Sequence, residues 1–307
     1  GRPVALKLLV PHLRKQADVT ERFAREARNA SRLSGPNAAQ VLDVDVLPDG
    51  SPFMVMELLQ GTELGQEVAR RGPLPIDEAV GYVLEACAAM AEAHAIGIVH
   101  RDLKPSNLFL ANHGAKRVVK VLDFGISKST GDAAAALTQT QTAFGTPLYM
   151  SPEQVRSVRS VDGRADIWSL GVILYEILTA KPPFDGPTPT AILAAIIADA
   201  PRPITDHRPD LPAPLAAAVM RTLTKDPAGR FAEVRGFAAA IAPFGPRDVQ
   251  AGWAAFAEPA ASTGRSNAST DPHDAPTIAL TAMSTPSHAL CGSAESRSSR
   301  GNGIPFK

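Results

Sequence analysis

Two short motifs contain the side chains of this sequence that are best suited to acid-base and metal chemistry. The first is HRDLKPSN at residues 100–107, and the second is DFG at residues 123–125. Asp102 can accept a proton, while Asn107 and Asp123 supply hard oxygen ligands of the kind that magnesium prefers. Magnesium completes its octahedron with water and phosphate oxygens, so one Asp and one Asn suffice as protein ligands. The two motifs therefore predict two metal-binding groups beside one catalytic carboxylate.

These motifs resemble the catalytic loop and the metal motif of protein kinases. Over residues 4–244 the chain resembles the eukaryotic-like (Hanks-type) serine/threonine protein kinases of bacteria. The resemblance implies that Asp102 accepts or orients the proton of the attacking hydroxyl and that Lys104 steadies the transferring phosphate. It also implies that ATP is the phosphate donor and that Asn107 and Asp123 each hold one Mg²⁺ ion. Catalysis of this kind needs positioning and charge stabilisation more than covalent chemistry from the protein.

The resemblance also assigns an ion pair to the nucleotide site. Lys7 ends a VALK strand and is expected to contact the α- and β-phosphates of ATP while pairing with Glu26 on the following helix. Glu26 lies nineteen residues after Lys7, in a stretch rich in good helix formers. The alternative is that Glu26 is a solvated partner of Arg22 at i,i+4, and the helical period does not choose between the two.

The adenine side of the site is likewise implied by the resemblance. Met56 stands at the family's gatekeeper position, so the carbonyl of Glu57 and the amide of Leu59 are expected to face the adenine. Ala5 above and Phe109 below are expected to sandwich the ring.

Lys104, two residues after Asp102, and Thr146 in GTPLYM are the choices typical of serine/threonine kinases. The implied function is transfer of the γ-phosphate of ATP to Ser or Thr of protein substrates. The rival hypothesis is a non-catalytic kinase-like scaffold that binds partners through the large lobe or the tail. The oligomeric state, the substrate and the activating signal do not follow from the residues.

The resemblance also implies that several residues hold the architecture. Glu153 should form a buried ion pair with Arg230, and the loss of one partner would leave the other charge uncompensated. Asp166 should accept hydrogen bonds from the backbone of the catalytic loop. His100 is expected to pack under Phe124, with no acid-base role.

A polar, Thr-rich stretch at residues 132–142 lies where the family has its activation loop. Thr138 and Thr140 lie seven and five residues before Gly145, at the spacing of activating phosphates in such kinases. A phosphate there could pair with Arg101 and Lys128. A merely solvated threonine loop is the alternative.

The expected fold is α+β, a two-lobed protein-kinase-like fold with a partial N-lobe at residues 1–58 and a mostly helical C-lobe at residues 59–244. Strands are expected at 4–10, 40–47 and 53–58, with a helix near 20–33. A further helix begins near Asp77 and Glu78 and delivers the chain to His100, burying Cys87 and His94 as packing residues. From Gly245 the composition shifts to Ala, Ser, Thr and Pro, so a disordered tail is expected at 245–307.

The sequence departs from the family pattern at its start. Only Gly1, Arg2 and Pro3 precede the lysine strand, so the two strands and the glycine-rich loop that lie over the phosphates in the family are missing. Their absence would uncover the adenine from one side and leave the edge of the lysine strand unpaired. The beginning with Gly and the retention of every catalytic residue favour a fragment of a longer kinase over a pseudokinase, and activity of this chain is expected to be weak or absent.

Composition supports one two-lobed domain. The chain has 307 residues, 45% of them hydrophobic, which suffices for a large core. A net charge of zero argues against broad nucleic-acid binding, which needs a basic patch. Cys87 and Cys291 are too far apart for a metal-site or disulfide pattern, which fits a reducing cytoplasm. The apolar stretches at 167–178 and 191–197 are too short to span a bilayer, and no signal peptide is visible.

Overall fold

The computed structural model describes residues 3–9, 17–114, 116–124, 147–156, 161–250 and 253. In the first helix the side chains of residues 17, 18, 22 and 26 are outside the described part. The chain divides into two units, Gly1–Ala261 and Ser262–Lys307, and every described residue belongs to the first. Of the predicted disordered tail at 245–307, residues 251–252 and 254–307 therefore fall outside the described residues.

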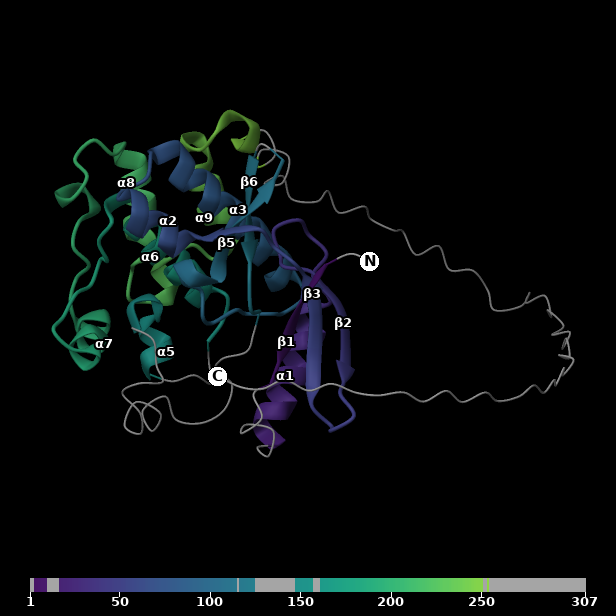
Figure 1. The fold of residues 1–307 in the computed structure, drawn as a ribbon. Coiled ribbons are helices and arrows are strands. Elements are labelled where there is room, and N and C mark those ends of the chain that lie inside the picture. Colours follow the sequence, from purple (N-terminus) through teal and green to yellow (C-terminus); the bar gives the residue numbers. More distant parts are fainter. Residues whose placement is uncertain are drawn as a thin grey trace, which may run out of the picture. The chain divides into compact units, whose positions relative to one another are not determined.

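A three-stranded antiparallel sheet and one helix form the N-terminal region (Figure 1). The sheet has the order β1-β3-β2, with β1 at Val4–Leu8, β2 at Val41–Val46 and β3 at Pro52–Glu57. Helix α1, at Ala17–Ala30, lies on this sheet and buries Phe23 and Ala27, which are four residues apart and share one helix face. These elements agree with the predicted strands and helix to within a few residues at each end.

A second antiparallel sheet follows, with the order β4-β5-β6. Its strands are β4 (Gly61–Glu63), β5 (Leu108–His113) and β6 (Lys116–Val121). At Gly61 the backbone has a φ of 155°, and a Cβ atom would lie 1.9 Å from the carbonyl oxygen of Leu110. Only glycine therefore lets β4 approach β5 this closely.

The remaining described elements are helices, and two of them form the centre of the core. Helix α3 (Ile76–Ala95) and helix α6 (Arg164–Thr179) are apolar around most of their circumference, which is typical of helices with neighbours on all sides. Helices α8 (Ala213–Thr222) and α9 (Val234–Ile241) pack against them. Smaller helices are α2 (Leu64–Arg71), α5 (Pro152–Arg156) and α7 (Pro189–Ala198). The mixed sheet-and-helix architecture confirms the predicted α+β fold with a mostly helical second part.

The packed region extends past the boundary that the sequence predicted at residue 244. Trp253 is buried in the core, and Lys116 pairs with Asp248 at 2.7 Å. Pro246 lies against Gly81 of α3, where a Cβ atom would be only 3.0 Å from its ring. The predicted disordered tail therefore starts too early in the sequence. The composition of the segment after residue 244 is that of a disordered chain, and it does not reveal that a single tryptophan is buried in the core.

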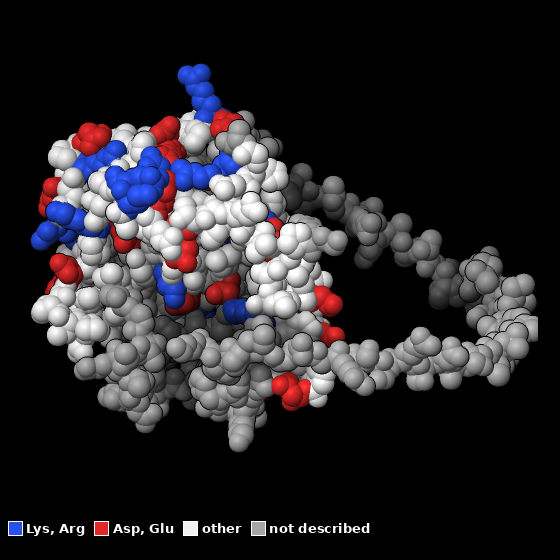
Figure 2. Space-filling view, viewed as in Figure 1, with Lys and Arg blue, Asp and Glu red and all other residues white. Residues whose placement is uncertain are grey.

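Charged side chains of both signs lie next to each other on the face shown in Figure 2. The most connected group surrounds Glu67 of α2, which is almost fully buried. Burial acts to raise the pKa of Glu67, but hydrogen bonds from Arg117, Arg70 and Arg71 outweigh it and lower the pKa to about 2. This network ties α2 to β6. Among the described residues, no helix has both the length and the apolar character that a bilayer span requires.

Candidate active site

The catalytic-loop motif lies between α3 and β5 and is held by one buried carboxylate of α6. Asp166 has no exposed surface and accepts the backbone N–H groups of His100 at 2.9 Å and Arg101 at 2.8 Å. His94 of α3 approaches the same carboxylate, with 2.8 Å between Nε2 and Oδ2. Three donors compensate the burial of this charge, so the loop is fixed to the most deeply packed helix of the fold.

His100 packs in the core beneath the metal motif. Its ring lies 5.2 Å from that of Phe124, and the histidine has no exposed surface. The N–H of Asp102 donates to Nδ1 at 3.3 Å, so the ring proton is on Nε2, which donates to the carbonyl of Leu122 at 2.9 Å. Both ring nitrogens are thus used within the fold, and none remains for proton transfer.

Asp102, Lys104 and Asn107 converge at the solvent side of this loop. The Lys104 ammonium lies 2.9 Å from Oδ2 of Asp102, and Nδ2 of Asn107 donates to the Asp102 carbonyl at 2.8 Å. Asn107 is placed by the short turn Pro105–Asn107, which turns its amide back toward Asp102. The Asp102 side chain is 29% exposed.

Lys7, which is expected to contact the phosphates of ATP, lies directly against the metal motif. Nζ of Lys7, on β1, lies 2.6 Å from Oδ1 of Asp123, which follows β6. Arg101 and Asp123 both have left-handed backbone conformations, with φ of 65° and 58°. Such conformations are costly for residues other than glycine and are concentrated at functional sites. Glu26, the expected partner of Lys7, belongs to α1, but its side chain is outside the described part.

The expected adenine-facing segment connects β3 to β4. The Glu57 carboxylate accepts the N–H of Gln40 at 2.8 Å and the ammonium of Lys120 at 2.7 Å, which fixes the end of β3 to β6. Leu59 follows this anchored residue. Ala5 and Phe109 lie on β1 and β5, and both are partly buried. The sequence did not single out Lys120, because an alternating strand pattern does not say which lysine meets which acid.

The pair of Glu153 and Arg230 joins α5 to the segment before α9. The two Arg230 nitrogens donate to the two Glu153 oxygens at 2.7 and 2.8 Å, and the Arg230 side chain is fully buried. Further donors of Arg230 reach the carbonyls of Thr224 at 2.8 Å and Arg164 at 3.0 Å. This bidentate geometry supplies the hydrogen bonds that a buried guanidinium requires.

Some residues near the loop were missed by the sequence reasoning. Gln154 of α5 donates to the carbonyl of Arg101 at 2.7 Å, which joins α5 to the catalytic loop. The hydroxyl of Tyr149 donates to Glu176 of α6 at 2.7 Å, and burial raises the pKa of that carboxyl. His94 was expected only to pack, yet it reaches Asp166. The sequence signal for this contact is weak: His94 lies in the last turn of its helix, six residues before His100.

Part of the expected site lies outside the described residues. The residues concerned are the glycine of the metal motif, the lysine expected to pair with a phosphothreonine, the two expected phosphosites and the threonine of the GTPLYM sequence at 145–150. They are Gly125, Lys128, Thr138, Thr140 and Thr146.

Comparison with known proteins gives a consistent family match. Residues 1–237 match the protein kinase domain family. The probable serine/threonine-protein kinase PknB of Corynebacterium glutamicum is 40% identical over 238 residues, which are 75% of this chain and 36% of that protein. The serine/threonine-protein kinase PknB of Mycobacterium tuberculosis is 39% identical over 233 residues, which are 75% of this chain and 37% of that protein. The chain thus spans little more than a third of the length of these relatives.

A solved structure gives the same family as the sequence comparisons. The crystal structure of the Mycobacterium tuberculosis PknI kinase domain superposes with a TM-score of 0.60 at 30% identity, covering 78% of this chain and 84% of that one.

Proposed function

The chain belongs to the protein kinase family, and from this premise we propose that it transfers the γ-phosphate of ATP to Ser or Thr hydroxyls of proteins. The observation that carries the proposal is the convergence of Lys104 and Asn107 on Asp102, in a loop whose backbone is held by the buried Asp166. Preorganised groups of this kind lower the barrier because they need no rearrangement when charge develops. Use of ATP would place the reaction in the cytoplasm.

In this mechanism Asp102 orients the substrate hydroxyl. Oδ2 of Asp102 is engaged by Lys104, so the hydroxyl proton would be directed to Oδ1. Lys104 would then stabilise the negative charge on the transferring phosphoryl oxygens. Lys7 would exchange part of its contact with Asp123 for the α- and β-phosphates, since one ammonium has three donors.

The donor set is compatible with magnesium. Nδ2 of Asn107 is used toward Asp102, which leaves its amide oxygen for a cation, and Oδ2 of Asp123 is not the oxygen that meets Lys7. The described residues contain no group of three or more His, Cys, Asp or Glu that could enclose a metal ion. Asn107 and Asp123 would therefore hold Mg²⁺ together with phosphate and water oxygens, where the ion neutralises charge on the phosphates.

We also propose that the chain is activated by phosphorylation at Thr140 or Thr138. The support comes from Arg101, whose buried Nε has no hydrogen-bond partner among the described residues. A phosphate that pairs with Arg101 would satisfy this donor and add a strong charge-assisted contact to the catalytic loop. Mass spectrometry of protein expressed with Asp102 intact and with Asp102→Asn tests whether the kinase modifies itself. Unmodified threonines in fully active protein would contradict this proposal.

Phosphate transfer from radiolabelled ATP to a Ser/Thr protein tests the main proposal. The assay uses the chain fused to the glycine-rich hairpin of a relative. Asp102→Asn and Asp123→Asn should each reduce transfer by at least about a thousandfold, since each removes a group that acts in the transition state. Asp77→Asn, which changes an exposed carboxylate of α3, should have no effect. Transfer that survives Asp102→Asn would contradict the assignment, and the absence of transfer from every version would favour the scaffold.

A further inference from the structure

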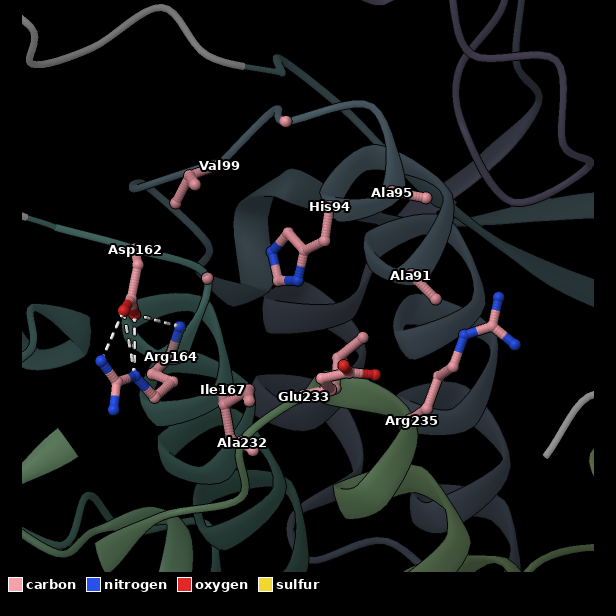
Figure 3. A pocket seen from close by; sticks show the side chains of 13 residues that line it. Ala91, His94, Ala95, Val99, Asp162, Arg164, Ile167, Ala232, Glu233 and Arg235 are labelled. Atoms are coloured by element: carbon pink, nitrogen blue, oxygen red, sulfur yellow. Dashed lines mark hydrogen bonds and ion pairs between the residues drawn. The ribbon is translucent and has the colours of Figure 1, made fainter. Parts of the chain in front are cut away.

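A cavity of about 390 Å³ lies between the end of α3, the start of α6 and the start of α9 (Figure 3). Its apolar surface includes Ala91, Val99 and Ile167. Its size is in the range of sites that take small organic molecules. None of the residues assigned to ATP, magnesium or the substrate hydroxyl lines it.

The charged side chains that line the cavity differ in whether they have a hydrogen-bond or ion-pair partner. Asp162 and Arg164 neutralise each other through hydrogen bonds, the shortest of 2.6 Å. Arg235 also has an interaction partner. The carboxylate of Glu233, by contrast, has no hydrogen bond or ion pair with any described residue, and it does not cap the helix α9 that it precedes. Glu233 is exposed to solvent, and it is the lining charge that remains available to a cationic ligand.

One wall of the cavity is connected to the catalytic loop. In Figure 3, His94 and Glu233 lie above and below the open space between α3 and α9. His94 contacts Asp166, and Asp166 in turn accepts the N–H groups of His100 and Arg101. His94 and Asp166 thus connect the cavity to the backbone of the catalytic loop, and Val99, which precedes His100, also lines the cavity.

The His94 ring also lies close to Gly163, which lines the same cavity. A Cβ atom on Gly163 would lie 2.8 Å from the ring, so Gly163 is in close contact with it. Because Gly163 restricts displacement of the ring in that direction, contact with a molecule in the cavity would hold His94 in place against Asp166.

We propose that this cavity binds a small organic cation, with its charged group on Glu233 and its apolar body against Ala91 and Ile167, and that the bound cation stabilises the catalytic loop through His94 and Asp166. The proposal does not depend on phosphate transfer by the chain. An amidinium or ammonium head forms a charge-assisted hydrogen bond with a carboxylate, which gives the site its selectivity for cations. The apolar body adds affinity by leaving water.

Benzamidine, its neutral isostere benzamide and the anion benzoate are the probes. Calorimetric titration of the full chain, with ATP present to occupy the nucleotide site, should give a Kd for benzamidine on the order of 1 mM, the range for so small a ligand. Benzamide and benzoate should bind at least tenfold more weakly. Glu233→Gln should weaken benzamidine binding at least tenfold, whereas Glu21→Gln, an exposed carboxylate of α1, should leave it unchanged. Equal binding of benzamidine and benzamide, or an unchanged Glu233→Gln variant, would overturn the site.

Hydrogen exchange of the amides of His100 and Arg101 tests the coupling. Saturating benzamidine should slow their exchange at least threefold in the wild type. In His94→Gln, benzamidine should still bind but leave this exchange unchanged. The coupling would be refuted by unchanged exchange in the wild type, or by the same slowing in both proteins.

Discussion

The N-terminal sheet exposes many of its apolar side chains, whereas the helical region buries most of its own. In the N-terminal region one small buried cluster is formed by Leu9, Phe23, Ala27 and Met54. On β1 of the same sheet, Val4, Leu6 and Leu8 are 41%, 57% and 48% exposed. In the helical region, by contrast, α6 is buried over almost its whole length. The groups that hold the catalytic loop are thus anchored in a deep core, whereas Lys7 belongs to a region with a thin one.

The largest loss of stability should come from a substitution in the helical region. Glu153→Gln removes the anionic partner of the fully buried Arg230 and should lower the free energy of unfolding by about 3 to 5 kcal/mol. Asp162→Asn breaks a more exposed pair with Arg164 and should cost less than about 1 kcal/mol. Urea denaturation followed by circular dichroism compares the two. Similar losses would mean that the buried pair has no special role in the core.

A substitution in the N-terminal cluster should destabilise that region without destabilising the helical region. Met54→Ala truncates a side chain of the N-terminal cluster that is only 1% exposed and should cost about 3 kcal/mol. Hydrogen exchange should rise throughout β1, β3 and α1 while α6 keeps its protection. If α6 exchanged faster to the same degree, the two regions would unfold as one unit and the comparison would fail.

An ion-pair network gives the helical region a pH dependence of its own. The pKa of Glu67 falls from its ordinary value of 4.5 to about 2, so its contribution to stability is complete above pH 4.5 and is lost as the pH falls through 2. At neutral pH this contribution is about 3 kcal/mol. Denaturation curves of the wild type and of Glu67→Gln should therefore differ most above pH 5 and converge toward pH 2. A constant difference over this range would show that Glu67 is not the titrating group.

The sequence predicted contacts better where a motif fixes both partners. Asp166 and Glu153 could be assigned to the catalytic loop and to Arg230, because the resemblance of their motifs to those of the family implies both contacts. Contacts between residues outside motifs, such as that of Lys120 with Glu57, were missed, because they depend on how β6 approaches the end of β3. The packing of Trp253 was missed for the same reason: a single buried side chain leaves no period in the sequence.

The smallest predicted change is a gain in stability. Ala180 follows α6 in the left-handed conformation, with φ of 53°, where residues with a Cβ atom are strained. Ala180→Gly should raise the free energy of unfolding by about 1 kcal/mol. Ala194→Gly, at an exposed position inside α7, should lower it by about 1 kcal/mol instead. A loss at both positions would show that the conformation of Ala180 is not a source of strain.

We propose that this chain carries a preformed catalytic loop, whereas its described residues form only a three-stranded sheet with a small buried cluster on the side expected to bind the nucleotide. Calorimetric titration with Mg-ATP tests it most directly, by comparing the chain as it stands with the same chain extended by a relative's glycine-rich hairpin ahead of β1. The extended chain should bind at least about tenfold more tightly, since the hairpin would add backbone donors to the phosphates and pair with β1, which is an edge strand among the described residues. Equal affinities would contradict the claim, because they would show that the sheet of β1, β2 and β3 already suffices to hold the nucleotide.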